Sequence, residues 1–102
     1  MRDLPNRDSF APLLNSQFRI VQGANVISMD LIEVSELRSS RHNEAFTLVF
    51  RGPSDRFLSQ STYQFDHPSL GVFELLIVPI GQDKHGLYYE ALFNRLRPVE
   101  QE

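Results

Sequence analysis

The chain has 102 residues, of which 41% are hydrophobic, and its ten basic and thirteen acidic side chains give a formal net charge of −3. This length and hydrophobic content are typical of one globular domain, so we expect a single domain over residues 1–102. The absence of cysteine excludes disulfides and thiolate metal sites, and the scattered basic residues argue against nucleic acid as the main partner.

The first predicted element is a short helix within an N-terminal segment of residues 1–16. Asn6 or Asp8 can cap it, and Phe10, Leu13 and Leu14 fall at i, i+3 and i+4 to form one apolar stripe. A helix this short is marginal alone. We therefore expect it to dock on the rest of the domain.

After residue 17 the hydrophobic period changes to two, which predicts β-strands. The second strand slips its alternation at Leu31-Ile32, which indicates a β-bulge. Residues 95–102 are predicted to be a flexible C-terminal tail. The six predicted strands cover residues 18–21, 27–34, 45–53, 61–68, 72–80 and 87–93.

Short strands separated by frequent turn signals predict an all-β fold. We expect an antiparallel meander of about six strands that closes into a small barrel, because closure removes exposed strand edges. The N-terminal helix would plug one mouth of this barrel or lie along an edge. The loop "GQDKHG" (residues 81–86) would connect the last two strands as a hairpin loop of about six residues.

The pair Asp66-His67 is the most conspicuous candidate for chemistry. We interpret "HPSLG" (residues 67–71) as a tight turn, because Pro68 restricts the backbone and Gly71 accepts a positive φ. Adjacent strand residues point to opposite faces, so Asp66 is poorly placed to orient a His67 base. We predict a solvated structural histidine, and near-neutral replacement of His67 by Asn.

The other polar residues give no catalytic, cofactor or metal site. The three histidines lie in predicted turns without the spacing of a metal pair. Arg51 should face outward and pair with an acid such as Glu33 or Glu74. We therefore predict that the protein is not an enzyme and needs no cofactor.

Strand 72–80 does not have the polar, solvent-facing side that the other predicted strands have. Phe73, Leu75 and Ile77 share one parity, yet the opposite parity is also largely apolar. Such a strand is covered on both faces or exposes a hydrophobic patch. The N-terminal helix, a second copy of the chain or another protein could cover it. The candidate interaction face consists of Val72, Leu76, Val78 and Ile80.

The strings "LLNSQFRI", "LIEVSEL", "FTLVFRGP", "YQFDHPSLGVFELLIVPIG" and "YYEALFN" together resemble a bacterial family of small all-β proteins of unknown function. The resemblance runs from about Phe10 to Asn94. Members of that family are often encoded beside phage-tail-like collar or fibre proteins. The resemblance implies an accessory role in such an assembly, and it transfers no catalytic residue.

These observations favour a non-enzymatic structural or protein-interaction module whose partner is itself, as a homo-oligomer, or a tail-type protein. The alternative is a small carrier that holds an apolar ligand inside the barrel. No apolar run approaches the roughly 20 residues of a membrane span. Because the first ten residues also lack an apolar signal core, we expect no membrane partner and a cytoplasmic location.

Overall fold

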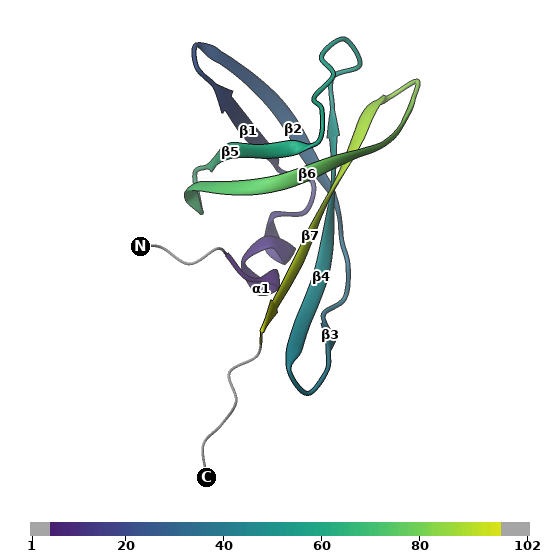
Figure 1. Cartoon of the computed structure of the whole chain (residues 1–102). Helices are drawn as coiled ribbons and strands as arrows, with labels where there is room; N and C mark the ends of the chain where they lie inside the picture. The colour runs from purple at the N-terminus through teal and green to yellow at the C-terminus, as the bar shows by residue number, and fades with distance from the viewer. Residues whose placement is uncertain (1–4, 97–102) are drawn as a thin grey trace.

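The computed structural model describes residues 5–96, and within them the chain forms a strand-rich domain with one short helical segment (Figure 1). The predicted residues 1–4 of the N-terminal segment and 97–102 of the C-terminal tail lie outside this part. The elements are α1 (Arg7–Phe10), η1 (Ala11–Leu13), β1 (Gln17–Gln22), β2 (Asn25–Val34), β3 (Arg38–Ser39), β4 (Asn43–Gly52), β5 (Ser61–His67), β6 (Gly71–Asp83) and β7 (Gly86–Leu96).

Six strands close a barrel in the order β2-β1-β5-β6-β7-β4, and β4 pairs with β2 to complete the ring. Every pairing is antiparallel. The short strand β3 continues along the β4 edge that β2 occupies further on (Figure 1). The predicted six-stranded antiparallel barrel with one N-terminal helix is confirmed, with β3 as one additional strand.

The order departs from a simple meander at one connection. β4 lies between β2 and β7, whereas β5 lies between β1 and β6, so residues 53–60 must cross one end of the barrel. A tyrosine from the interior holds this crossover. The hydroxyl of Tyr89 accepts a hydrogen bond from the Leu58 N–H at 3.0 Å and donates one to the Arg56 carbonyl at 3.4 Å.

Alternation of side chains explains the core, because successive strand residues point to opposite faces. Most inward-facing strand residues are buried, although Tyr63 is only partly buried, and the predicted bulge in β2 is present as a register shift between Leu31 and Glu33. Residues packed in the interior are Phe10, Phe18, Ile20, Ile27, Met29, Leu31, Phe46, Leu48, Phe50, Leu58, Phe65, Phe73, Leu75, Ile77, Leu87, Tyr89, Ala91 and Phe93.

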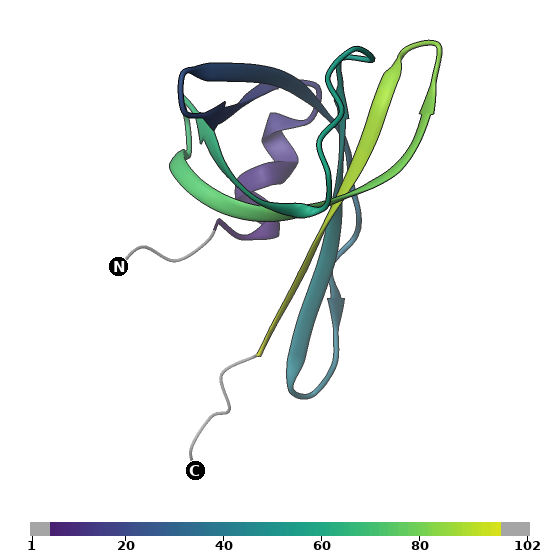
Figure 2. The ribbon, with the colours of Figure 1, turned by 45° about the horizontal axis from the view of Figure 1, so that its top comes forward.

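The helical segment plugs one end of the barrel (Figure 2). Asn6 is its cap, since its side-chain oxygen accepts from the Ser9 N–H at 2.9 Å. Phe10 is fully buried, with its ring centroid 5.4 Å from Phe93 and 5.8 Å from Phe73. The predicted stripe is only partly correct, because the chain tightens into η1 after Phe10 and leaves Leu14 exposed.

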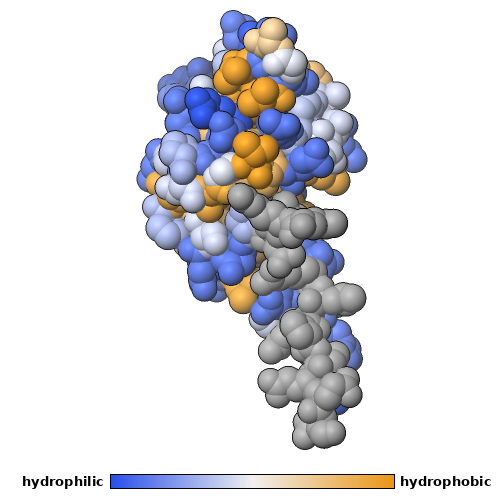
Figure 3. Space-filling model, turned by 90° about the vertical axis from the view of Figure 1, so that its left-hand side faces the viewer, coloured by the Kyte–Doolittle hydropathy of each residue, from blue (hydrophilic) through white to orange (hydrophobic). Residues whose placement is uncertain are grey.

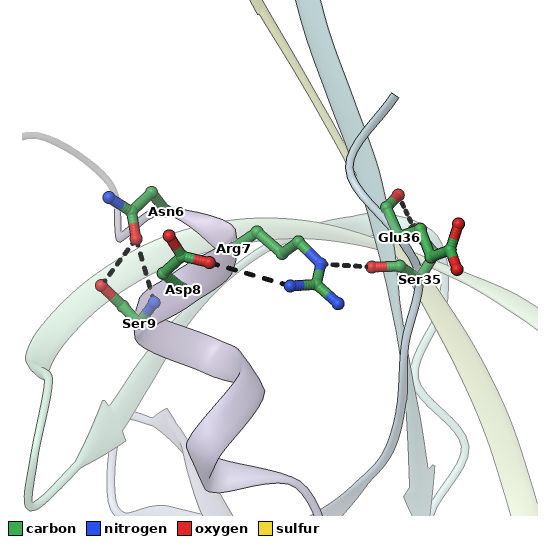
Figure 4. Close-up of polar contacts among 6 residues, drawn as sticks. All are labelled: Asn6, Arg7, Asp8, Ser9, Ser35 and Glu36. Carbon is green, nitrogen blue, oxygen red and sulfur yellow. Dashed lines mark hydrogen bonds and ion pairs between the residues drawn. The ribbon is translucent and has the colours of Figure 1, made fainter. Parts of the chain in front are cut away.

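A side-chain contact ties the helix to the far side of the barrel. The Nε of Arg7 donates to the Ser35 carbonyl oxygen at 2.7 Å, just after β2 ends (Figure 4). The Arg7 guanidinium also lies 3.7 Å from the exposed Asp8 carboxylate. No helix among residues 5–96 has the length and apolar character needed to cross a membrane.

Two predicted segments, the β6–β7 loop and the C-terminal tail, differ from the structure. The β6–β7 hairpin loop is only Lys84–His85, because pairing continues to Asp83 opposite Gly86. The Asp83 carboxylate accepts from the His85 N–H at 2.8 Å, which stabilises this tighter turn. At the other end, β7 continues to Leu96, so residues 95 and 96 belong to the strand and not to the predicted tail.

Candidate functional site

His67 is buried, and the prediction of a solvated histidine was wrong. Only 5% of its surface is exposed, because it is the last residue of β5 and shares the inward parity of Phe65. Its Nε2 lies 3.0 Å from the Ser16 hydroxyl oxygen, and its Nδ1 accepts from the Ser69 N–H at 3.0 Å. The turn itself is as predicted, with Leu70 bonded to the His67 carbonyl and Gly71 at a φ of 78°.

The hydrogen bonds of His67 define a structural role. The Ser16 hydroxyl donates to the Leu13 carbonyl at 2.6 Å, so its oxygen is left to accept from Nε2–H of His67. Nδ1 is occupied as an acceptor, which requires the neutral imidazole. Burial lowers the pKa of His67, and the nearby Asp66 carboxylate opposes this shift to a smaller extent.

The carboxylate of Asp66 points away from His67. It accepts a hydrogen bond from Arg19 at 2.7 Å on the outer face of β1 and β5. Arg51 faces outward as predicted, but its partner is Asp30 at 3.3 Å on the neighbouring β2 strand, and not Glu33 or Glu74. His67 therefore lies in the core, whereas Asp66 forms an ion pair on the outer face, so the two side chains do not form a general-base pair.

A second polar contact, missed from the sequence, lies in the β6–β7 hairpin. The Tyr88 hydroxyl donates to the two carboxylate oxygens of Asp83 at 3.0 and 2.9 Å. This hydrogen bond is the main cause that raises the pKa of Tyr88, whereas the His85 N–H contributes most to lowering the pKa of Asp83. Both groups are exposed, and their contact closes the hairpin. Among residues 5–96 no group of three or more His, Asp or Glu side chains is arranged to hold a metal ion.

The predicted interaction face lies on the outside of β6. Val72, Leu76 and Ile80 are 52%, 51% and 51% exposed, while Val78 is half-buried beside Glu90. The helical segment leaves this row uncovered, because Phe10 packs against Phe73 on the inner face. On one side the row meets the polar outer residues of β5, which are Thr62, Gln64 and Asp66.

Figure 3 shows hydrophobic atoms that reach the surface in a band between hydrophilic ones, on the left-hand side of the view in Figure 1. Single exposed apolar side chains are ordinary on protein surfaces, whereas a contiguous group marks an interaction site. Val72, Leu76 and Ile80 lie four residues apart along one strand, with the exposed Glu74 between the first two and the half-buried Val78 between the last two, so they form an interrupted apolar row.

The row borders a break in the barrel wall. β6 and β7 pair from Asp83–Gly86 down to Val78–Glu90, and a register shift at Pro79–Gly81 bends β6 there. Below that point β6 turns to pair with β5, and β7 continues along β4. Figures 1 and 2 both show the two strands separating. We call the separated residues Glu74–Leu76 and Leu92–Asn94 the β6–β7 fork.

A groove of about 220 Å³ occupies the β6–β7 fork. Its floor reaches the core, and its rim includes Leu92, which is 62% exposed. This groove was not predicted from the sequence, although Pro79 within an apolar strand was a signal of a bulge there. The groove is lined by Pro5, Phe46, Glu74, Leu75, Leu76, Leu92, Phe93 and Asn94.

Comparison with known proteins gives one match. The model of a domain of unknown function, DUF6916, matches residues 5–93. No curated protein and no solved structure matches the chain. The family match thus covers the helical plug and the barrel, except for the last three residues of β7.

Proposed function

The chain belongs to the family described as a domain of unknown function, DUF6916, and we propose that it acts as a non-enzymatic structural or protein-interaction module. The observation that carries this proposal is the exposed apolar row Val72, Leu76 and Ile80, with Val78 between them. Burying such a row against another protein removes apolar surface from water, at roughly 25 cal/mol per Å².

The environment of the ionisable groups supports a role other than catalysis. His67 is neutral and enclosed by hydrogen bonds, and Asp66 is engaged by Arg19. A general base needs access to its substrate and a pKa near the working pH. Burial lowers the pKa of His67 without opening a path to it.

The proposed partner is a second copy of the chain or a tail-type protein. An accessory role in a phage-tail-like assembly is the setting that the family resemblance suggests, and a cytoplasmic location remains a prediction. The bacterial origin is part of the same proposal. Each of these proposed roles needs a stable protein-binding surface on β6.

The alternative, a carrier with an apolar ligand inside the barrel, receives no support from the core. The interior positions are filled by the chain's own side chains, including seven of its phenylalanines and Tyr89. Six-stranded barrels are small enough for side chains to fill them. We therefore place the functional surface on the outside of β6.

Sedimentation velocity over a range of concentrations tests self-assembly. We expect the sedimentation coefficient of the natural chain to rise with concentration, and Leu76→Asp to abolish this rise because it places a charge in the contact. Val26→Asp is the matched control, since Val26 is 55% exposed on β2, outside the row. A monomer at high micromolar concentration, with Leu76→Asp unchanged in stability and in capture of proteins from the native host, would contradict the proposal.

A further inference from the structure

We propose that the β6–β7 fork binds an extended polypeptide segment of another protein, which adds as a strand between β6 and β7. This inference rests on the proposed function as an interaction module and names the chemistry of its partner. It concerns the groove between the strands, which shares Leu76 with the exposed row on the outer face of β6.

The two strands of the fork pair with different neighbours. Residues 71–77 of β6 pair with β5, and residues 91–96 of β7 pair with β4, but these two stretches do not pair with each other. Each therefore turns one backbone edge toward the fork. Edges of this kind are templates for an added strand, because alternate N–H and C=O groups point along the sheet.

The groove in the fork is small. Its volume of about 220 Å³ is smaller than the range of roughly 300–1,000 Å³ that is usual for small-molecule sites. In the proposed complex, one or two side chains of the added strand enter the groove, and its backbone pairs with the strand edges outside it. An apolar small molecule would leave those backbone groups without a partner.

The alternation of the fork specifies the side chains of the occupant. Leu75 and Phe93 point inward, while Glu74, Leu76 and Leu92 point outward. Neighbouring strands in a sheet keep side chains on matching faces. An added strand would thus place every second residue over the core, where an apolar side chain is required.

Charge specifies the other residues of the occupant. Glu74 is an exposed carboxylate on the rim, and the residues that line the groove include no Lys or Arg. An outward-facing Lys or Arg beside Glu74 would form a cross-strand pair of opposite charge. The favoured ligand therefore alternates apolar and basic residues.

A second copy of the chain is a poorer occupant. Within residues 5–96 the strands of a copy are already paired in its own sheet. Entry into the fork requires a segment that is unpaired on both edges. No strand within residues 5–96 of a copy meets this requirement, and we assign the occupant to an extended segment of a different protein.

A direct test uses a fluorescein-labelled peptide with the repeat Lys-Val as the probe. We expect saturable binding by fluorescence anisotropy, and amide shifts in the NMR spectrum centred on residues 74–76 and 91–94. The same peptide methylated on alternate backbone nitrogens is the control, because it keeps the side chains but loses the N–H donors. Equal binding of both peptides, or shifts centred elsewhere, would overturn the proposal.

Variants give a second readout. Leu92→Ser, which removes an apolar contact without adding a charge, should weaken binding of the Lys-Val peptide by tenfold or more, whereas Val26→Ser should not. Glu74→Lys should weaken the Lys-Val peptide and strengthen a Glu-Val peptide. The same affinity for both peptides in Glu74→Lys as in the natural chain would contradict the predicted role of this carboxylate.

Different experimental results would refute the self-assembly proposal and the strand-addition proposal. Val72 belongs to the exposed row but does not line the groove. Val72→Asp should impair self-assembly in sedimentation and leave peptide binding intact. If the natural chain assembles, Val72→Asp does not, and the natural chain binds no peptide, the strand-addition inference alone is refuted. If the natural chain binds the peptide but stays monomeric at all concentrations, self-assembly alone is refuted.

Discussion

The Nε2 atom of His67 and the hydroxyl oxygen of Ser16 form a hydrogen bond of 3.0 Å between positions 51 residues apart. Ser16 lies between η1 and β1, and His67 ends β5. The bond therefore fastens the end of the helical plug to the β5–β6 hairpin. The ring of Phe18 packs on the imidazole, with centroids 4.4 Å apart.

Replacing His67 with Asn should destabilise the domain. The shorter side chain cannot reach both Ser16 and the Ser69 N–H, and a buried polar group left without its partner costs about 1–3 kcal/mol. Urea denaturation measures the difference. His42→Asn is the control, because His42 is exposed and should change stability by less than ~0.5 kcal/mol. Equal stability of the two variants would show that the His67 hydrogen bonds contribute nothing.

The stability of the domain should decrease as the pH is lowered, and His67 should account for part of this decrease. Burial lowers the pKa of folded His67 below its ordinary value of 6.5, so protons bind the unfolded chain preferentially. The contribution is complete above 6.5 and is lost as the pH falls through 6.5 toward the folded-state pKa. Urea midpoints between about pH 8 and pH 5 should show the natural chain losing its advantage over His67→Asn. An advantage that stays constant over this range would contradict the neutral imidazole.

Gly86→Ala should destabilise the β6–β7 hairpin. Gly86 has a φ of 148°, and a Cβ atom there would overlap the carbonyl oxygen of Gly52 on β4. We expect a loss of more than about 1 kcal/mol in unfolding free energy. Gly81→Ala is the matched control, because a Cβ at Gly81 meets no atom within 4 Å. Thermal unfolding compares the two, and a Gly86→Ala chain as stable as Gly81→Ala would show that the hairpin tolerates the shift.

Tyr89→Phe should loosen the crossover of residues 53–60. The phenol hydroxyl is the acceptor for the buried Leu58 N–H, and its loss should cost about 1–2 kcal/mol. Hydrogen exchange localises the effect, because exchange at the Leu58 amide should accelerate more than at amides of β1. Tyr63→Phe is a suitable comparison, since the Tyr63 hydroxyl is exposed and donates to the Ser59 carbonyl. Unchanged protection of the Leu58 amide would contradict this role of Tyr89.

The sequence was informative where a strand has one buried face. Alternation in residues 45–51 is enough to place Phe46, Leu48 and Phe50 in the core, where they are buried, and the slip at Leu31-Ile32 correctly identified a bulge. These features are local, since the backbone period alone decides them. The strand order was less accessible, because residues 53–60 carry no signal that distinguishes a hairpin loop from a crossover.

The two errors near the candidate site have physical causes. The turn at Pro68 was extended back to include His67, although the inward parity of Tyr63 and Phe65 continues to that residue. The fork could not be seen from sequence, because it arises when β6 and β7 pair with different neighbours. Only the closed barrel brings Leu76 and Leu92 to one groove.

The crossover has a consequence for how the chain reaches its native state. The hairpins β1–β2, β5–β6 and β6–β7 join neighbouring segments, but closure requires β1 to meet β5, where Arg19 and Asp66 are 47 positions apart. Chains dominated by such distant pairings fold in milliseconds to seconds, because loop entropy is lost before the contacts form. Synthesis must also reach β7 before β4 acquires its longest partner, so the ring completes only after the final strand has emerged.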